Sequence, residues 1–131
     1  MENKNLFTQK TSIKRFIFAV ENRMFVKAHE LLEEDWKEYK KIYKQTNDES
    51  YRIKAKAVQG LINGATALAL YFDKKRPNSY KKTWEVFKKY EPLIKISNLE
   101  ILDDYLKAKN ILNSINSSIE INDTIFYSEK N

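Results

Sequence analysis

One short segment holds most of the residues that could carry chemistry. His29, Glu33 and Trp36 are spaced i, i+4 and i+7, so they share one face if the segment is helical. His29 is the one histidine of the chain, and Glu30 lies beside the same face. A histidine next to a carboxylate can act as a general acid or base, because the carboxylate orients the imidazole ring. His29 and Glu33 are therefore the candidate catalytic residues.

The same segment also offers ligands for a divalent metal. The candidate ligands are His29, Glu30 and Glu33. One histidine with two carboxylates suits manganese, iron or magnesium better than zinc, and the order His-Glu-x-x-Glu lacks the second histidine of a zincin helix. A single helix supplies an incomplete ligand set, so a divalent cofactor stays an open alternative.

A second polar stripe lies on a segment that is otherwise apolar. Gln59, Asn63 and Thr66 follow the same i, i+4, i+7 spacing. If the two segments pack as antiparallel helices, His29 and Glu33 can meet Gln59 and Asn63, and buried polar groups need such partners. The predicted ligand-binding residues are His29, Glu30, Glu33, Trp36, Gln59 and Asn63. Two interpretations follow: a hydrogen-bond network that fixes helix pairing, which is favoured, or a pocket for a small polar ligand.

The apolar spacing of three and four residues predicts an all-α fold, because two glycines and two prolines are too few for a many-turned β protein. We expect a compact bundle of about five helices with a short irregular or strand-like C-terminal tail. Caps and apolar periodicity place the helices at residues 13–20, 25–43, 46–73, 78–91 and from 97 onward. Pro92 is expected to end the fourth helix, and alternating isoleucines predict a strand-like tail after residue 117.

The predicted third helix is apolar on nearly all sides, which is typical of a buried central helix. Ala57, Gly60, Gly64 and Ala67 form one ridge of small residues along it. Such a ridge lets another backbone approach closely. We therefore expect a close helix crossing at Gly60 or Gly64.

Charge and composition narrow the classes of partner. Lys and Arg number 24 against 18 Asp and Glu, a net charge of +6, but only four of the basic residues are arginine. A lysine surface of this kind predicts at most weak, nonspecific association with nucleic acid.

The chain has no cysteine, which excludes disulfides and thiolate ligands and fits a cytoplasmic location. We expect no signal peptide and no membrane span, and a homo-oligomer is left open.

Two motifs together resemble a known family. They are Ala28-His29-Glu30-x-x-Glu33-Glu34-x-Trp36 and Gln59-Gly60-Leu61-Ile62. This combination resembles the uncharacterised helical family called domain of unknown function 309, over about residues 13–90. The resemblance implies a small all-α domain whose His, Glu, Trp and Gln side chains converge between two helices, and it implies no established activity.

The chain also departs from the family pattern. Glu21 and Arg23 stand where the family usually has Asn and Gly, and Asn63 replaces a second glutamine. Ser79-Tyr80 replaces a glycine–alanine pair at the start of the fourth helix. We expect a single domain over residues 1–131, with a family-like core at 13–95 and a protein-specific helix and tail at 96–131.

The predicted function is a small cytoplasmic binding or interaction domain with a His–Glu–Gln polar site between the second and third helices. The alternative is a small metal-dependent or acid–base, hydrolase-like enzyme that uses His29 and Glu33. Nonspecific nucleic-acid association through the lysine-rich surface is a weaker alternative.

Overall fold

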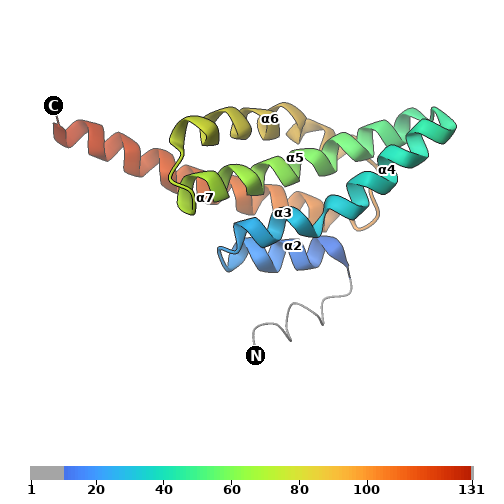
Figure 1. Cartoon of the computed structure of the whole chain (residues 1–131), viewed down its shortest axis with the longest axis horizontal. Helices are drawn as coiled ribbons and strands as arrows, with labels where there is room; N and C mark the ends of the chain where they lie inside the picture. Colours follow the sequence, from blue (N-terminus) through green and yellow to red (C-terminus); the bar gives the residue numbers. More distant parts are fainter. Residues whose placement is uncertain (1–10, 131) are drawn as a thin grey trace.

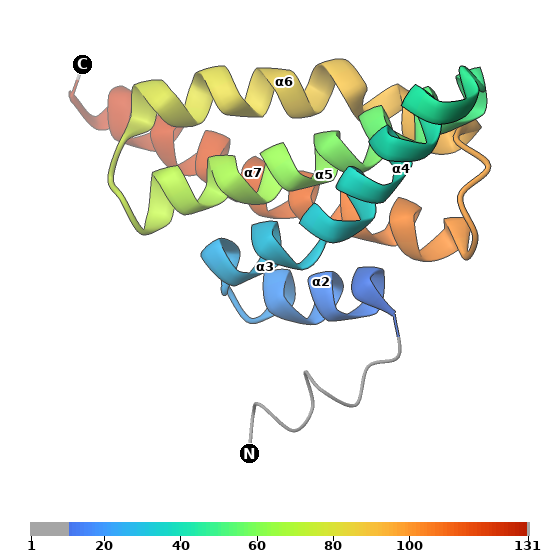
Figure 2. The same ribbon diagram turned by 45° about the vertical axis from the view of Figure 1, so that its right-hand side comes forward.

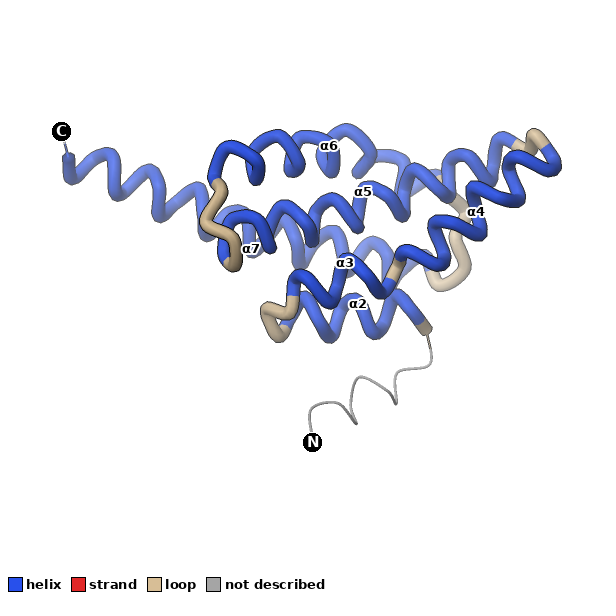
Figure 3. The backbone as a smooth tube through the Cα atoms, viewed as in Figure 1, coloured by secondary structure: helices blue, strands red, loops and turns tan. Residues whose placement is uncertain are grey.

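The described part of the chain is entirely helical, which confirms the predicted all-α class. A computed structural model describes residues 11–130, with side chains described for residues 11–119. Figure 3 shows helices joined by short loops and no strand within these residues. None of the helices searched is both long and apolar enough to cross a membrane. The elements are, in order, α2 (Ser12–Glu21), α3 (Phe25–Leu31), α4 (Glu33–Thr46), α5 (Glu49–Phe72), α6 (Pro77–Ile96) and α7 (Leu102–Lys130).

Helix α5 is the centre of the bundle, as its apolar sequence predicts. It lies between α6 on one side and α2 and α3 on the other (Figure 1 and Figure 2). It contacts α3, α4, α6 and α7, and its contact with α6 is the most extensive in the molecule. The helix begins after Asp48, whose carboxylate accepts a hydrogen bond of 3.0 Å from the backbone N–H of Ser50. Every other helix takes its position from this element directly or through one neighbour.

The two glycines of α5 allow the close crossing with α6. A Cβ atom added at Gly60 would lie 3.0 Å from the Cβ atom of Tyr90, and one at Gly64 would lie 2.8 Å from Cδ1 of Leu112. Both glycines and the flanking Ala57 and Ala67 are buried. The predicted ridge of small residues therefore faces its neighbours, and the predicted close approach at Gly60 is confirmed.

The predicted helix over residues 25–43 is wrong in one respect, because it breaks at Leu32. Leu32 ends α3 and begins α4, and its side chain is fully buried. In one continuous helix, Glu33, Glu34 and Asp35 would lie in the interior, one turn from Glu30, and like charges at that spacing repel. The break places these three acids in the first turn of α4, where the helix dipole favours negative charge.

The turn between α2 and α3 holds Arg23 in a left-handed conformation, with φ of 61°. The backbone N–H of Met24 donates to the Ala19 carbonyl across 2.8 Å, which closes the turn. A residue with a Cβ atom pays about 1–2 kcal/mol for this conformation, whereas glycine adopts it freely. The glycine that the family resemblance implies at this position would avoid that cost.

Pro92 does not end the fourth helix, contrary to the prediction. Helix α6 continues through it to Ile96. The extra turn carries Ile94, which is completely buried, and burying such a side chain contributes about 1.5–3 kcal/mol. That gain offsets much of the cost of a proline inside a helix, about 3 kcal/mol. Ser97 does not cap the next helix; it shapes the loop by donating to the Ile94 carbonyl across 2.7 Å.

The strand-like tail was also predicted wrongly, because residues 117–130 continue helix α7. Leu112, Ile115 and Ile119 are spaced i, i+3 and i+7, and all three are buried. This helical pattern outweighs the local alternation of Ile119 and Ile121, because it lets one face pack continuously on the core. The buried hydroxyl of Tyr80 also donates a hydrogen bond to Asn116, which ties α6 to α7.

Gly60 offers a direct test of the close helix crossing. Gly60→Leu should lower the free energy of unfolding by about 1–3 kcal/mol, because the side chain would force α5 and Tyr90 apart. Urea denaturation measures the change. Glu85→Leu on the exposed face of α6 is the control, and it should stay within about 0.5 kcal/mol of the parent. If the Gly60 variant unfolds like the parent, the close crossing is absent in solution.

Candidate functional site

His29 and Glu33 form an ion-pair contact across the break between α3 and α4. The Nε2 atom of His29 lies 3.0 Å from Oε1 of Glu33, and the two side chains are 33% and 37% exposed. The other ring nitrogen, Nδ1, lies 2.9 Å from the backbone carbonyl oxygen of Val26. Both ring nitrogens thus face oxygen atoms of the chain, one on the backbone and one on a side chain.

This arrangement fits a link between two helices better than an acid–base site. His29 lies in the last turn of α3 and Glu33 in the first turn of α4, where the dipole of α4 favours the Glu33 carboxylate. A general acid or base needs a ring nitrogen free to face a substrate, and here both are engaged within the chain. The pair can fix the angle at which α4 leaves α3.

Of the three predicted metal ligands, His29 and Glu33 are in contact, whereas Glu30 does not join them. Adjacent residues on a helix project about 100° apart, and the exposed Glu30 carboxylate instead lies 4.0 Å from the ammonium group of Lys27. Among the described residues there is no group of three histidine, cysteine or acidic side chains that could hold a metal ion. His29 and Glu33 alone would give only two of the ligands that a divalent cation needs.

Gln59 and Asn63 do not hydrogen-bond to His29 or Glu33, contrary to the expectation. The side-chain amide of Asn63 donates to the backbone carbonyl of Gln59 across 3.0 Å, and the Thr66 hydroxyl donates to the Ile62 carbonyl across 2.9 Å. The polar stripe of α5 is therefore satisfied largely by its own helix, so it does not require a partner on α3.

The helices pack antiparallel as expected, but their register differs from the one expected. Phe25 stacks on Phe72 with ring centroids 5.6 Å apart, and Tyr39 lies 6.3 Å from Tyr51. Between these contacts, Trp36 comes to the level of Gln59. His29 precedes Trp36 by seven residues, about two helical turns. Because the helices are antiparallel, His29 lies about two turns beyond Gln59, toward the C-terminal end of α5.

Trp36 and Gln59 share a groove between α4 and α5, which we call the α4–α5 groove. Its volume is about 510 Å³, within the range of about 300–1,000 Å³ typical of small-ligand sites. Four basic side chains and two aromatic ones line it, so it combines positive charge with flat apolar surface. The lining residues are Trp36, Lys40, Tyr43, Lys44, Arg52, Ala55, Lys56 and Gln59.

Most of the positive charge in the groove is not neutralised within the described part of the chain. Arg52 forms an ion pair with Glu49. Lys40, Lys44 and Lys56 have no carboxylate within ion-pair distance among the described residues. The Lys40 ammonium instead lies 4.1 Å from the centroid of the Trp36 ring, a favourable cation–π distance. The groove is therefore an electropositive surface with an aromatic wall.

Trp36 and Gln59 of the groove were predicted from the sequence, whereas its lysines were not. The sequence does contain a regular pattern of basic residues. Trp36, Lys40 and Lys44 are spaced i, i+4 and i+8 on α4, and Arg52 and Lys56 are spaced i and i+4 on α5. Two helix faces with the same charge suggest a shared anion site only once their antiparallel pairing is known.

Asp35 is a second polar residue that the sequence analysis did not single out. Burial raises the pKa of the Asp35 carboxyl, and a hydrogen bond from Ser12 and the charge of Arg15 offset only part of that rise. The Nε atom of Arg15 is itself buried without a hydrogen-bond partner among the described residues. Keeping the Asp35 carboxylate charged at the start of α4 therefore lowers the free energy of unfolding.

A comparison of the sequence with known protein families identifies one match. Residues 13–82 match the protein family described as "Domain of unknown function (DUF309)". The chain belongs to this family. No curated protein and no solved structure matches it. The DUF309 region contains α2 to α5 and the start of α6, and so it includes the whole α4–α5 groove, whereas α7 lies outside it.

The contact between His29 and Glu33 in this DUF309 domain can be measured with a double-mutant cycle. We expect His29→Ala and Glu33→Ala to show a coupling free energy of about 0.2–1 kcal/mol in urea denaturation, because the pair is partly exposed to solvent. Zero coupling would mean that the contact is not formed. A coupling above about 2 kcal/mol would indicate the buried network that the sequence suggested.

Asp35 gives a prediction for the pH dependence of stability. Because its pKa is higher in the folded protein than the ordinary value of 3.8, its contribution to stability is full below that value and is lost as the pH rises through the folded-state pKa. Asp35→Asn should therefore be at least as stable as the parent at pH 7 and should lose that advantage toward pH 3. Glu34→Gln, at the exposed neighbouring carboxylate, is the control. A neutral-pH loss of stability specific to Asp35→Asn would contradict the assignment.

Proposed function

We propose that the chain is a small cytoplasmic binding domain whose α4–α5 groove binds a ligand that carries a phosphate group and a planar ring, such as a nucleotide. One observation carries this proposal: within a single groove of about 510 Å³, lysines without carboxylate partners among the described residues flank aromatic side chains. The cytoplasmic location is supported by the cysteine-free sequence.

Each part of the groove suits a different part of such a ligand. Lys40, Lys44 and Lys56 offer ammonium groups that attract phosphate oxygens as point charges. Trp36 and Tyr43 offer flat faces, and aromatic side chains favour stacked planar rings. The side-chain amide of Gln59 has both a donor and an acceptor for the polar edge of a ring. The combination favours a phosphorylated aromatic compound over a simple inorganic anion.

The enzyme alternative has less support in the geometry. Both ring nitrogens of His29 engage acceptors within the chain, at Val26 and Glu33. The DUF309 family carries no described activity. A binding domain requires only the groove, whereas a hydrolase would require His29 to leave at least one of its present contacts.

A second candidate function is nonspecific association with nucleic acid. A neighbouring depression on α4 shares two lysines with the groove and extends its positive charge along the helix. Its lining residues are Lys37, Lys40, Lys41, Lys44 and Gln45. A continuous basic path of this kind suits a polymer of phosphates as well as a single one, so the experiment includes an oligonucleotide.

Calorimetric titration of the full chain tests the proposal. We expect adenosine monophosphate to bind more tightly than either inorganic phosphate or adenosine, because it alone engages both the lysines and the aromatic wall. Lys44→Gln and Lys56→Gln should each weaken this binding about tenfold, which corresponds to about 1.4 kcal/mol. Lys107→Gln, an exposed lysine on α7, is the matched charge control and should have no effect. Affinity should fall as salt rises.

Two results would overturn the proposal. If adenosine binds as tightly as the monophosphate, or if Lys44→Gln and Lys56→Gln bind like the parent, the groove does not recognise phosphate through its lysines. If instead oligothymidylate gains affinity steadily with length while the mononucleotide does not bind, the second candidate is correct and the basic path of α4 is a nucleic-acid surface.

A further inference from the structure

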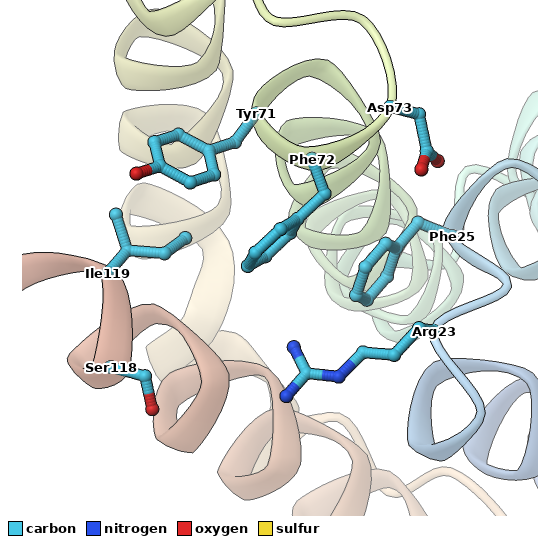
Figure 4. A pocket seen from close by; sticks show the side chains of 7 residues that line it. All are labelled: Arg23, Phe25, Tyr71, Phe72, Asp73, Ser118 and Ile119. Atoms are coloured by element: carbon cyan, nitrogen blue, oxygen red, sulfur yellow. The ribbon is translucent and has the colours of Figure 1, made fainter. Parts of the chain in front are cut away.

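A second cavity lies at the opposite end of α5 from the α4–α5 groove. It sits between the turn that joins α2 to α3, the C-terminal end of α5 and helix α7 (Figure 4). Its volume is about 400 Å³, the size of a small-ligand site. We call it the Arg23 pocket, and it is lined by Arg23, Phe25, Tyr71, Phe72, Asp73, Ser118 and Ile119. Gln59 of the groove and Tyr71 of the second cavity are separated by about 18 Å along α5.

The walls of the Arg23 pocket are aromatic side chains that pack against one another. Phe25 stacks on Phe72 with centroids 5.6 Å apart, and the edge of Tyr71 meets Phe72 with centroids 5.0 Å apart. Ile119, which is 2% exposed, adds an aliphatic surface from α7. Rings packed in this way form a preorganised apolar wall, which suits a flat or branched apolar group.

The charged groups of the pocket are separated from each other. The guanidinium of Arg23 extends into the cavity toward Ser118, while the Asp73 carboxylate lies at the far edge (Figure 4). The Arg23 Cζ atom is 5.5 Å from the centroid of the Phe72 ring, a cation–π distance. No carboxylate of the described residues lies within ion-pair distance of Arg23. An arginine held over a ring and without an acidic partner among the described residues presents a fork of N–H donors.

We propose that the Arg23 pocket binds a small carboxylate that carries an aromatic ring. The guanidinium of Arg23 pairs with the ligand carboxylate, for which its planar fork is geometrically matched. The ring of the ligand packs against Phe72 and Tyr71, which are partly exposed, while the buried Phe25 supports Phe72 from behind. Asp73, at the other edge of the cavity, repels the ligand carboxylate. The carboxylate end of the ligand therefore faces Arg23. This site is independent of the α4–α5 groove and does not rest on the function proposed for it.

The test uses 3-phenylpropionate and its neutral amide, 3-phenylpropionamide, in NMR titrations of the full chain. We expect the carboxylate to bind at least tenfold more tightly than the amide, with shift changes at Phe25, Phe72 and Asp73. Arg23→Gln should remove that preference, whereas Lys82→Gln, an exposed basic residue on α6, should keep it.

Arg23→Gly separates binding from folding. Glycine suits the left-handed backbone at this position, where φ is 61°, so this variant should melt at the same temperature as the parent or higher while losing carboxylate binding at least tenfold. Saturation of the groove with adenosine monophosphate should leave the affinity for 3-phenylpropionate unchanged. Equal binding of the carboxylate and the amide, retained binding in Arg23→Gly, or no binding of 3-phenylpropionate to the parent would each overturn the proposal.

Discussion

The absence of side chains at two positions of α5 is the constraint on which the rest of the structure depends. Gly60 and Gly64 leave room for Tyr90, Phe87 and Leu112 to approach the backbone of α5. This approach buries one side of α5 against α6 and α7 and leaves the other side for α3 and α4. Because protein interiors are close-packed, a helix fixed so tightly on one side has little freedom to slide or rotate on the other.

That fixed helix then sets which residues can meet across the bundle. The aromatic contacts of Phe25 with Phe72 and of Tyr39 with Tyr51 determine the register of α3 and α4 against α5. In this register Trp36 reaches the level of Gln59, and lysines from both helices line the same groove. His29 lies about two turns away, where it joins α3 to α4 through Glu33. The residues of the two sequence motifs are thus divided between the contact of His29 with Glu33 and the α4–α5 groove.

Some of this was predictable from sequence and some was not, for physical reasons. The helices 12–21 and 49–72 follow from apolar spacing, which is a local signal, and Thr11 caps the first of them. The second begins after Asp48 and not at residue 46 as predicted, because Thr46 is the last residue of α4. The break at Leu32 has no glycine or proline to mark it, and it places three acids in the first turn of α4. Pro92 and the tail were misjudged because tertiary burial of Ile94 and Ile119 outweighed local preference. Which side chains share a helix face is a local property that the sequence shows, but which faces meet depends on packing between distant residues.

The central claim is this register, because it places Trp36, and not His29, opposite Gln59. The most direct measurement is an NMR experiment that detects proton pairs closer than about 5 Å. The account predicts cross-peaks between the rings of Phe25 and Phe72 and between those of Tyr39 and Tyr51, whose centroids are 5.6 Å and 6.3 Å apart. Cross-peaks between the His29 ring and the Gln59 side-chain amide, with the aromatic pairs absent, would contradict it.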